Sequence, residues 1–315
     1  MSLTDDIKHK SLELGFDLVG ITDATAIDAE QVGLLTGWLK AGYAGQMSYM
    51  HRNIEKRINP ANLLENAQSV ICVGLNYKPS KTQLKTSDVT VPAGRIATYA
   101  QYEDYHPFIK KRLRKLAEFI VSLAGTDSKF KICVDSAPLA ERALAARAGL
   151  GFIGKNRMLI NPEFGPQIFL GEIITTLKLT PDKSIKANCA GCNKCTSACP
   201  TGALRPDGQL DANKCISYLT IEHKGQIPPH LAKKVGDRLF GCDECILACP
   251  YQQDAPVCKN KQFKFYGNRN ELNLQQILDL SQTNFESSFA DSVLKRLGLD
   301  RLKTNAQICL ENIKK

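Results

Sequence analysis

Apolar residues in the first part of the chain alternate between helical spacing and short strand-like runs. An apolar-periodic segment near the N-terminus stops at Gly15, and a short apolar run follows it directly. Later runs rich in Val and Ile are bounded by polar segments, as strands are. The pattern predicts helices at 4–14 and 137–148, and strands at 16–21, 69–75, 131–134 and 167–177. It indicates an α/β domain over residues 1–180.

The predicted helix at residues 106–120 is strongly two-sided. Ile109, Leu113, Leu116 and Ile120 recur at helical spacing and predict a buried stripe. Four cations gather on another side, namely Lys110, Lys111, Arg114 and Lys115. Such a face is either simply solvated or a binding surface for phosphate. The formal charge of +9 and the pI near 8.9 permit a nucleic-acid partner without requiring one.

The character of the chain changes after residue 180. Residues 181–262 carry closely spaced cysteines among turns, as a small domain built around metal does, and residues 263–315 are helical and polar. We therefore expect a second domain at 181–262 and a helical C-terminal extension at 263–315. No apolar run reaches the roughly 18 to 20 residues that a membrane span needs. The acidic N-terminus lacks a signal-like apolar segment, so we expect a cytoplasmic protein with reduced thiols.

Two cysteine runs carry the clearest chemistry. A C-x2-C-x2-C-x3-C-P run is followed by a C-x2-C-x3-C-P run, and Cys215 is the only cysteine between them. A bacterial-type ferredoxin holds two [4Fe-4S] clusters on eight thiolates, and the last cysteine of each run reaches the other cluster. This predicts one cluster on Cys189, Cys192, Cys195 and Cys249, and another on Cys199, Cys215, Cys242 and Cys245. Zinc on paired C-x2-C units is the alternative.

Several separated segments, together with the cysteine spacing, resemble the epoxyqueuosine reductase family. The segments are YAQYEDYH at 99–106, VDSAPLAER at 134–142, GLGFIGKN at 149–156, PEFG at 162–165, FLGE at 169–172, CISYLTIE at 215–222 and GDRLFGCD at 236–243. The resemblance implies a corrinoid-binding α/β domain, similar to that of reductive dehalogenases, joined to a two-cluster ferredoxin domain. It also implies cobalamin as a cofactor, although the chain has no D-x-H-x-x-G signature for a histidine ligand to cobalt.

The implied reaction is the reduction of epoxyqueuosine to queuosine in the anticodon loop of tRNA with GUN anticodons. Electrons from an unidentified low-potential donor would pass through the two clusters to cobalamin. Asp135 matches the family's proton donor, and we expect burial against the corrin to raise its pKa. A helix N-cap is the other interpretation of Asp135. His106 is a second candidate, although a histidine that opens a helix is often structural, and Tyr105 either stacks on the base or packs in the core.

The resemblance also implies contacts with the cofactor and the RNA. The cofactor contacts would come from Arg57, Gly154, Lys155, Asn156, Leu159, Leu170 and Ser217. Glycines in the segment 149–156 permit close backbone approach to a flat ligand, but they also suit an ordinary turn. The RNA contacts would come from the four cations at 110–115 and from Thr220, His223 and Lys224, for which a structural role after Cys215 is the alternative.

Other functions remain open at the level of the sequence. The chain could reduce a small organic substrate with a corrinoid and the same clusters, or it could be a ferredoxin-type electron carrier. Among the other cysteines, Cys72 and Cys133 lie in apolar strands and are expected to be buried. Cys258 and Cys309 carry no pattern.

Overall fold

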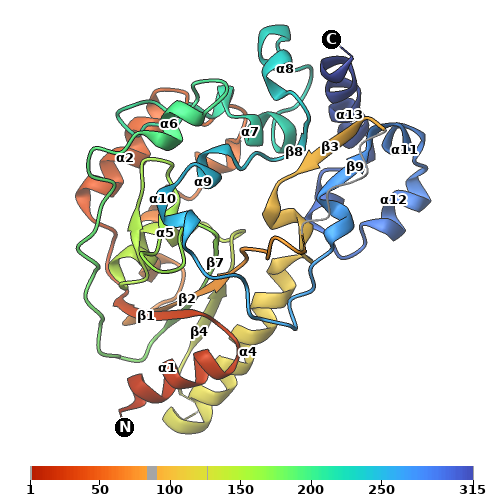
Figure 1. Ribbon diagram of the computed structural model, residues 1–315. Coiled ribbons are helices and arrows are strands. Elements are labelled where there is room, and N and C mark those ends of the chain that lie inside the picture. The colour runs from red at the N-terminus through yellow and green to blue at the C-terminus, as the bar shows by residue number, and fades with distance from the viewer. Residues whose placement is uncertain (1, 84–90, 126, 315) are drawn as a thin grey trace.

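The computed structural model describes residues 2–83, 91–125 and 127–314. A four-stranded sheet with the order β1-β2-β7-β4 lies at the centre of the N-terminal half (Figure 1). Every neighbouring pair in it is antiparallel, so the alternation of helices and strands along the chain does not produce a parallel sheet. The four strands are β1 (Leu18–Asp23), β2 (Ser69–Asn76), β4 (Phe130–Cys133) and β7 (Ile168–Thr175).

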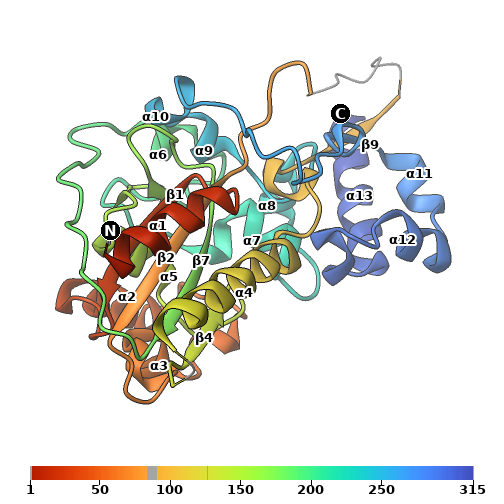
Figure 2. The ribbon, with the colours of Figure 1, turned by 90° about the horizontal axis from the view of Figure 1, so that it is seen from below.

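Helices cover both faces of this sheet. The first face lies under α1 (Leu3–Glu13) and α4 (Tyr105–Ala124), which run side by side in Figure 2. The opposite face packs against α5 (Glu141–Arg147). Because both faces are covered, the central strands read as continuous apolar runs without alternation, and every residue of β2 is buried. The stripe predicted on α4 is fully buried.

The antiparallel pairing decides which strand ends lie at the same edge of the sheet. β2 and β4 both pair antiparallel with β7, so they run in the same direction and their carboxyl ends lie at one edge. The loop that follows β4 therefore leaves the sheet beside the start of β7 and the end of β2. This is the edge at which residues 134–140 begin.

A second, three-stranded sheet joins distant parts of the chain. Its order is β8-β3-β9, with β3 (Ala93–Ile96) paired to β8 (Arg238–Phe240) and β9 (Glu271–Asn273). The C-terminal helices pack on it around an apolar cluster in which Leu294 and Leu302 are fully buried. This sheet takes one strand from each of the three predicted segments, so the segments share a core.

The cysteine-rich part consists of short helices and turns. It contains α6 (Lys194–Ala198), α7 (Ile216–Ile221), α8 (Pro229–Val235), α9 (Glu244–Leu247) and α10 (Pro250–Gln253). Next to it is the small hairpin of β5 (Phe152–Ile153) and β6 (Leu159–Ile160). The remaining helices are α2 (Ala29–Lys40), α3 (Ile54–Ile58), α11 (Leu274–Asp279), α12 (Gln282–Ser288) and α13 (Leu299–Ile313). Within the described ranges, no helix combines the length and apolarity needed to span a membrane.

Candidate active site and cluster ligands

Asp135 lies in an irregular loop between β4 and α5. The predicted helix over 137–148 begins only at Glu141, and its N-cap is Ala140, so Asp135 does not cap it. Asp135 has a φ of 56°, a left-handed conformation that Asp and Asn tolerate better than most residues. Its side chain is 57% exposed. The loop therefore presents this carboxylate at the sheet edge.

His106 joins Asp135 to a second, partly buried acidic group. Asp104 is the N-cap of α4, where its carboxylate accepts the main-chain N–H of His106 at 2.9 Å. The same oxygen lies 2.6 Å from Nδ1 of the imidazole, and Nε2 lies 3.1 Å from Oδ2 of Asp135. His106 itself is only 4% exposed. The geometry places one imidazole between two carboxylates.

The fourth member of this network comes from the far end of the chain. Nη1 of Arg296 lies 3.0 Å from Nε2 of His106, and Nη2 donates to Asp104 at 3.4 Å. Arg296 belongs to a 3-10 turn at Val293–Arg296, which the C-terminal helices hold in place. No motif in the sequence marks this residue, and sequence reasoning missed it.

The protonation states in the network follow from these contacts. Burial opposes the charged imidazole, but hydrogen bonds to Asp104 and Asp135 outweigh it and raise the pKa of His106. The hydrogen bond from His106 lowers the pKa of Asp135 despite its partial desolvation, with help from the charge of Arg296. The expected rise in the pKa of Asp135 requires burial against the corrin, so it stays a prediction. In the chain by itself, the hydrogen bond from His106 outweighs desolvation.

Tyr105 and Arg57 border the same loop. The Tyr105 ring stacks between His106 and Phe169, at centroid distances of 4.0 and 4.2 Å. Arg57 accepts the Ala140 N–H through its main-chain oxygen at 3.1 Å. Its Nε is buried and has no hydrogen-bond partner in the described part of the chain, which leaves one donor for a ligand. Tyr105 thus packs beside the site, and Arg57 has a donor available there.

The first predicted set of cluster cysteines lines one cavity. Its walls contain all four of these side chains together with residues of the β5–β6 hairpin and of α10. The main-chain N–H of Lys155 points at Sγ of Cys189, at 3.4 Å. Burial raises the pKa of Cys249, and the charges of the other three cysteines raise it further, as expected for thiols held close together. The members are Cys189, Cys192, Cys195 and Cys249.

The second predicted set also gathers in space. Burial raises the pKa of Cys245, and the next contributions come from Cys215 and Cys242, with Cys199 also acting on it. All twelve cysteines are free thiols. Among the described residues, no three potential ligands converge on a point as they do around a single metal ion.

The turn at Gly154, Lys155 and Asn156 lies between the two cysteine sets. Asn156 lines the first cavity, and its side-chain amide donates to the main-chain oxygen of Cys245 at 3.3 Å. A Cβ on Gly154 would lie 2.3 Å from Ile160, so packing inside the hairpin already requires this glycine. The glycine therefore does not by itself point to a flat ligand.

The other predicted cofactor contacts have mixed surroundings. Leu159 is 3% exposed and packs in the core cluster beneath α5, where Leu170 is a partly buried neighbour. Leu159 could therefore contact a ligand only through its main chain. Ser217 is half-buried in the first turn of α7.

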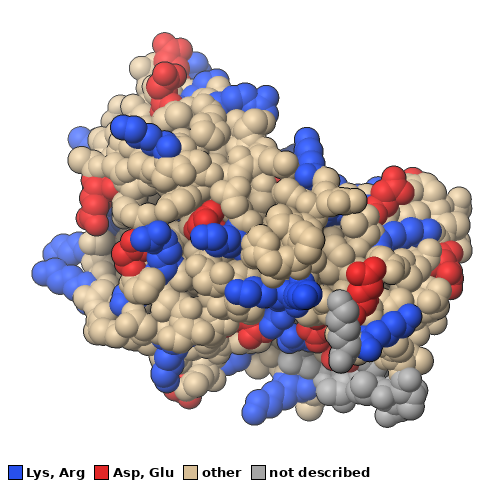
Figure 3. All heavy atoms as spheres, turned by 90° about the horizontal axis from the view of Figure 1, so that it is seen from above, with Lys and Arg blue, Asp and Glu red and all other residues tan. Residues whose placement is uncertain are grey.

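The predicted RNA contacts divide into exposed and buried residues. We call Lys110, Lys111, Arg114 and Lys115 the basic arc of α4; the last three are exposed and Lys110 is half-buried. Lys224 is exposed and His223 half-buried. Thr220 is fully buried, and its hydroxyl donates to Ile216 and accepts the N–H of Gly241. An RNA contact by Thr220 is therefore wrong. On the face shown in Figure 3, cationic side chains lie in separate groups with acidic ones among them.

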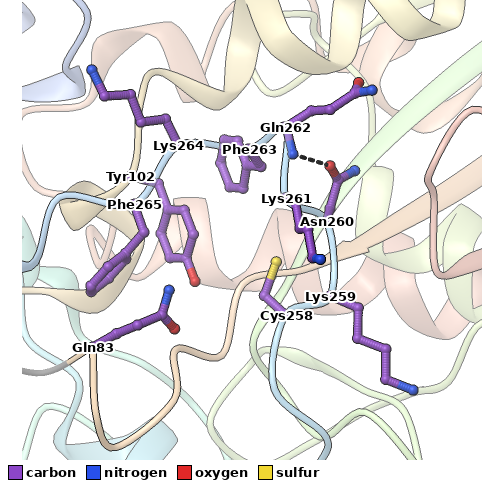
Figure 4. Close-up of a pocket in the computed structure, with 10 residues that line it drawn as sticks. All are labelled: Gln83, Tyr102, Cys258, Lys259, Asn260, Lys261, Gln262, Phe263, Lys264 and Phe265. Atoms are coloured by element: carbon purple, nitrogen blue, oxygen red, sulfur yellow. Dashed lines mark hydrogen bonds between the residues drawn. The ribbon is translucent and has the colours of Figure 1, made fainter.

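A separate hollow of about 560 Å³ lies beside the segment that leads to η5 (Gly267–Arg269). Tyr102 and Phe263 stack on one side of it, and Lys259 and Lys261 stand at its rim (Figure 4). None of the predicted catalytic residues or cluster ligands lines it. The hollow is distinct from the Asp135 site.

Family models match two parts of this chain. A family model described as epoxyqueuosine reductase QueG matches residues 57–136, and one described as a 4Fe-4S double cluster binding domain matches residues 188–252. The epoxyqueuosine reductase of Pseudomonas aeruginosa is 38% identical over 98% of this chain and 85% of its own length. That of Vibrio cholerae is 35% identical over 98% of this chain and 83% of its own length.

Solved structures agree in the same way. An epoxyqueuosine reductase with an epoxyqueuosine-modified tRNA-Tyr stem loop matches with a TM-score of 0.92 at 32% identity, over 99% of this chain and 82% of that one. The Bacillus subtilis enzyme, with its catalytic aspartate loop swung out of the active site, matches with a TM-score of 0.91 at 31% identity. The match covers 99% of this chain and 82% of that one. A reductive dehalogenase matches with a TM-score of 0.50 at 15% identity, over 98% of this chain and 36% of that one, and so shares the fold alone. The chain therefore belongs to the epoxyqueuosine reductase family.

Proposed function

We propose that this protein reduces epoxyqueuosine to queuosine in the anticodon loop of tRNA, with Asp135 as the proton donor. The observation that carries the proposal is the hydrogen-bonded row of Asp104, His106 and Asp135, exposed at a sheet edge in a chain of this family. The proposed substrate places the enzyme in the cytoplasm, where tRNA is used.

The reaction sets the requirements for the site. Conversion of the epoxide to an alkene takes up two electrons and two protons and releases the oxygen as water. A proton must reach the departing oxygen, and two electrons must arrive at carbon. Side chains of the protein can supply the proton, whereas the electrons must come from redox groups.

The cysteine sets fit two [4Fe-4S] clusters. Each set contains four thiols, and the family model of this segment is that of a double-cluster domain. We propose Cys189, Cys192, Cys195 and Cys249 for one cluster, and Cys199, Cys215, Cys242 and Cys245 for the other. The N–H of Lys155 donates toward Cys189, and such hydrogen bonds to cluster sulfur tune the potential.

The residues near Asp135 also fit a cobalamin. The unpaired Nε of Arg57 is a buried donor that a ligand would satisfy, and the turn of Lys155 and Asn156 lies against the cluster cysteines. When bound there, cobalamin would supply low-valent cobalt able to act on carbon. We propose that Arg57, Gly154, Lys155, Asn156, Leu170, Ser217 and the main chain of Leu159 border it.

The chain's own residues handle the proton. His106 is held protonated by Asp104 and lies 3.1 Å from Oδ2 of Asp135, so a proton at Nε2 can move to that oxygen. Asp135 then carries the proton that it gives to the departing oxygen. A ligand that covers Asp135 would remove water from it and raise its pKa toward that of a donor. Asp104 keeps the imidazole oriented through Nδ1, and Nε2 can accept a hydrogen bond from Arg296 once its proton has left.

The basic arc of α4 begins one turn after this site. We propose that the arc and the polar side chains of His223 and Lys224 contact the phosphates of the anticodon stem loop. The modified base would be unstacked and read in the pocket, as enzymes that act on a base require. Phosphate contacts would hold the loop in register while the base enters.

Anaerobic turnover tests the proposal. Epoxyqueuosine-containing tRNA, cobalamin and a strong reductant are incubated with the cluster-loaded enzyme, and the nucleosides are analysed by mass. We expect the mass to fall by one oxygen atom. An unchanged nucleoside with both clusters and cobalamin present would refute the proposal. Reduction of a small organohalide instead would favour a dehalogenase-type enzyme.

A further inference from the structure

Glu172 is a carboxyl group in the middle of the central sheet. It lies in β7 opposite Cys72 of β2 and Cys133 of β4, and it is fully buried. As a carboxylate, it finds no hydrogen-bond donor for either oxygen among the described residues. An isolated charge in such a place is costly, so the group must keep a proton or gain a partner. Neither core packing nor the proposed mechanism explains why a carboxyl is here.

Glu141 lies next to Glu172 and connects it to the active-site loop. It is the first residue of α5, which packs against β7. Its Oε1 accepts the main-chain N–H of Asp135 at 2.5 Å. Because α5 packs on β7, the two carboxyls face each other, and a proton on Glu172 supplies the donor that the pair otherwise lacks. The chain of contacts is Glu172, Glu141 and the Asp135 backbone.

The Asp135 backbone needs such an anchor. Its φ of 56° is uncommon for a residue with a side chain, and such conformations persist only where neighbouring contacts hold them. The N–H bond to Glu141 is the contact that fixes the peptide plane before Asp135. Without this hydrogen bond, the loop could move and carry the carboxylate of Asp135 away from His106.

We propose that Glu141 and Glu172 form a buried carboxyl pair that shares a proton and holds the Asp135 backbone in its active conformation. Both are then positioning residues, since neither touches the substrate. This inference rests on the proposed role of Asp135 as the proton donor. It assigns a purpose to the buried acid of β7.

Electrostatics support the pair. Burial raises the pKa of Glu141 to about 7, with a further contribution from the charge of Asp135, and burial raises that of Glu172 well above its usual range. Near neutral pH the pair therefore retains a proton while Glu141 can carry the charge that strengthens its bond to the Asp135 N–H. The titratable or charged groups within reach are Cys72 of β2, Cys133 of β4, Arg57 of α3, Tyr105 of α4, Arg142 of α5 and Asp135.

Hydrogen exchange of the loop gives a test that does not require turnover. The full-length, cluster-loaded enzyme is compared with Glu141→Ala, Glu141→Gln and Glu172→Gln, and exchange is followed in a peptide covering residues 134–140. Loss of a hydrogen bond to a charged acceptor should speed exchange of the Asp135 amide by about tenfold or more in Glu141→Ala. Glu30→Ala removes an acidic residue from the first turn of α2 and should leave this peptide unchanged.

The two conservative variants separate positioning from packing. Glu141→Gln keeps an acceptor without a charge, so it should restore part of the protection and show less pH dependence. Glu172→Gln keeps a donor that faces Glu141 and cannot ionise. The peptide should therefore be as well protected from exchange as in the wild type, and this protection should not decrease at alkaline pH. In turnover, Glu141→Ala should lower kcat by about tenfold with an unchanged KM for tRNA.

The result decides the inference whether or not the proposed function holds. Wild-type exchange of residues 134–140 in Glu141→Ala, over the whole pH range, would overturn the pair as an anchor. If wild-type enzyme fails to reduce epoxyqueuosine while the exchange of Glu141→Ala rises as stated, the proposed function fails and the anchoring inference stands.

Discussion

Replacement of Asp135 by Asn removes the proposed proton donor with little change in shape. Asn adopts a positive φ as readily as Asp does, and the side chain is 57% exposed, so the free energy of unfolding should change by less than about 0.5 kcal/mol. An amide cannot deliver a proton, and general acid catalysis contributes about 10²- to 10⁴-fold. We therefore expect kcat to fall by about that factor. The pKa of His106 should also fall, because its bond to Asp135 raises it.

Single-turnover reduction of epoxyqueuosine-containing tRNA under saturating reductant measures this effect. Visible absorbance of the clusters and of bound cobalamin checks that Asp135→Asn keeps its redox groups. Asp28→Asn is a matched control, because Asp28 is an exposed residue before α2 that makes no side-chain cap. A rate for Asp135→Asn within threefold or so of wild type would refute the assignment, since it lies far below the loss expected for a general acid.

Substitutions in four other parts of the molecule have equally definite expected outcomes. Cys215→Ser should lower the iron content from about eight to about four atoms per chain by elemental analysis, whereas Cys258→Ser should not change it. Gln at all four positions of the basic arc should reduce the slope of log affinity for tRNA against log salt by about 3, and an unchanged slope would mean a merely solvated face. Arg296→Gln should move the alkaline limb of the pH–kcat profile to higher pH, because the guanidinium lowers the pKa of Asp135. Glu172→Gln should raise Tm more at pH 8 than at pH 5: the folded-state pKa of Glu172 is raised, so the stability that its proton provides is present at low pH and is lost as pH rises.

The local patterns predicted most elements of the fold but not their arrangement. The strands at β2 and β7 and the buried stripe of α4 could be predicted because their apolar spacing depends only on neighbours in the chain. The antiparallel order of the sheet and the strand of β3 that joins two distant segments depend on pairing across long separations. The helical spacing also predicted that this helix starts at residue 137, whereas α5 begins at Glu141. Contacts of the loop from 134 to 140 override the helical propensity there.

The sequence by itself determined the family and predicted the cluster chemistry. The spacing of the cysteines is typical of a two-cluster ferredoxin and predicts two sets of four ligands, with zinc as the alternative, and long separate motifs indicated Asp135 and His106. Only the tertiary structure decided the electrostatics of the site. Arg296 approaches His106 from 190 residues away. Glu172 belongs to the FLGE segment at 169–172, but only the fold buries its carboxyl completely in β7. Protonation depends on burial and on partners in space, and neither is a local property of the chain.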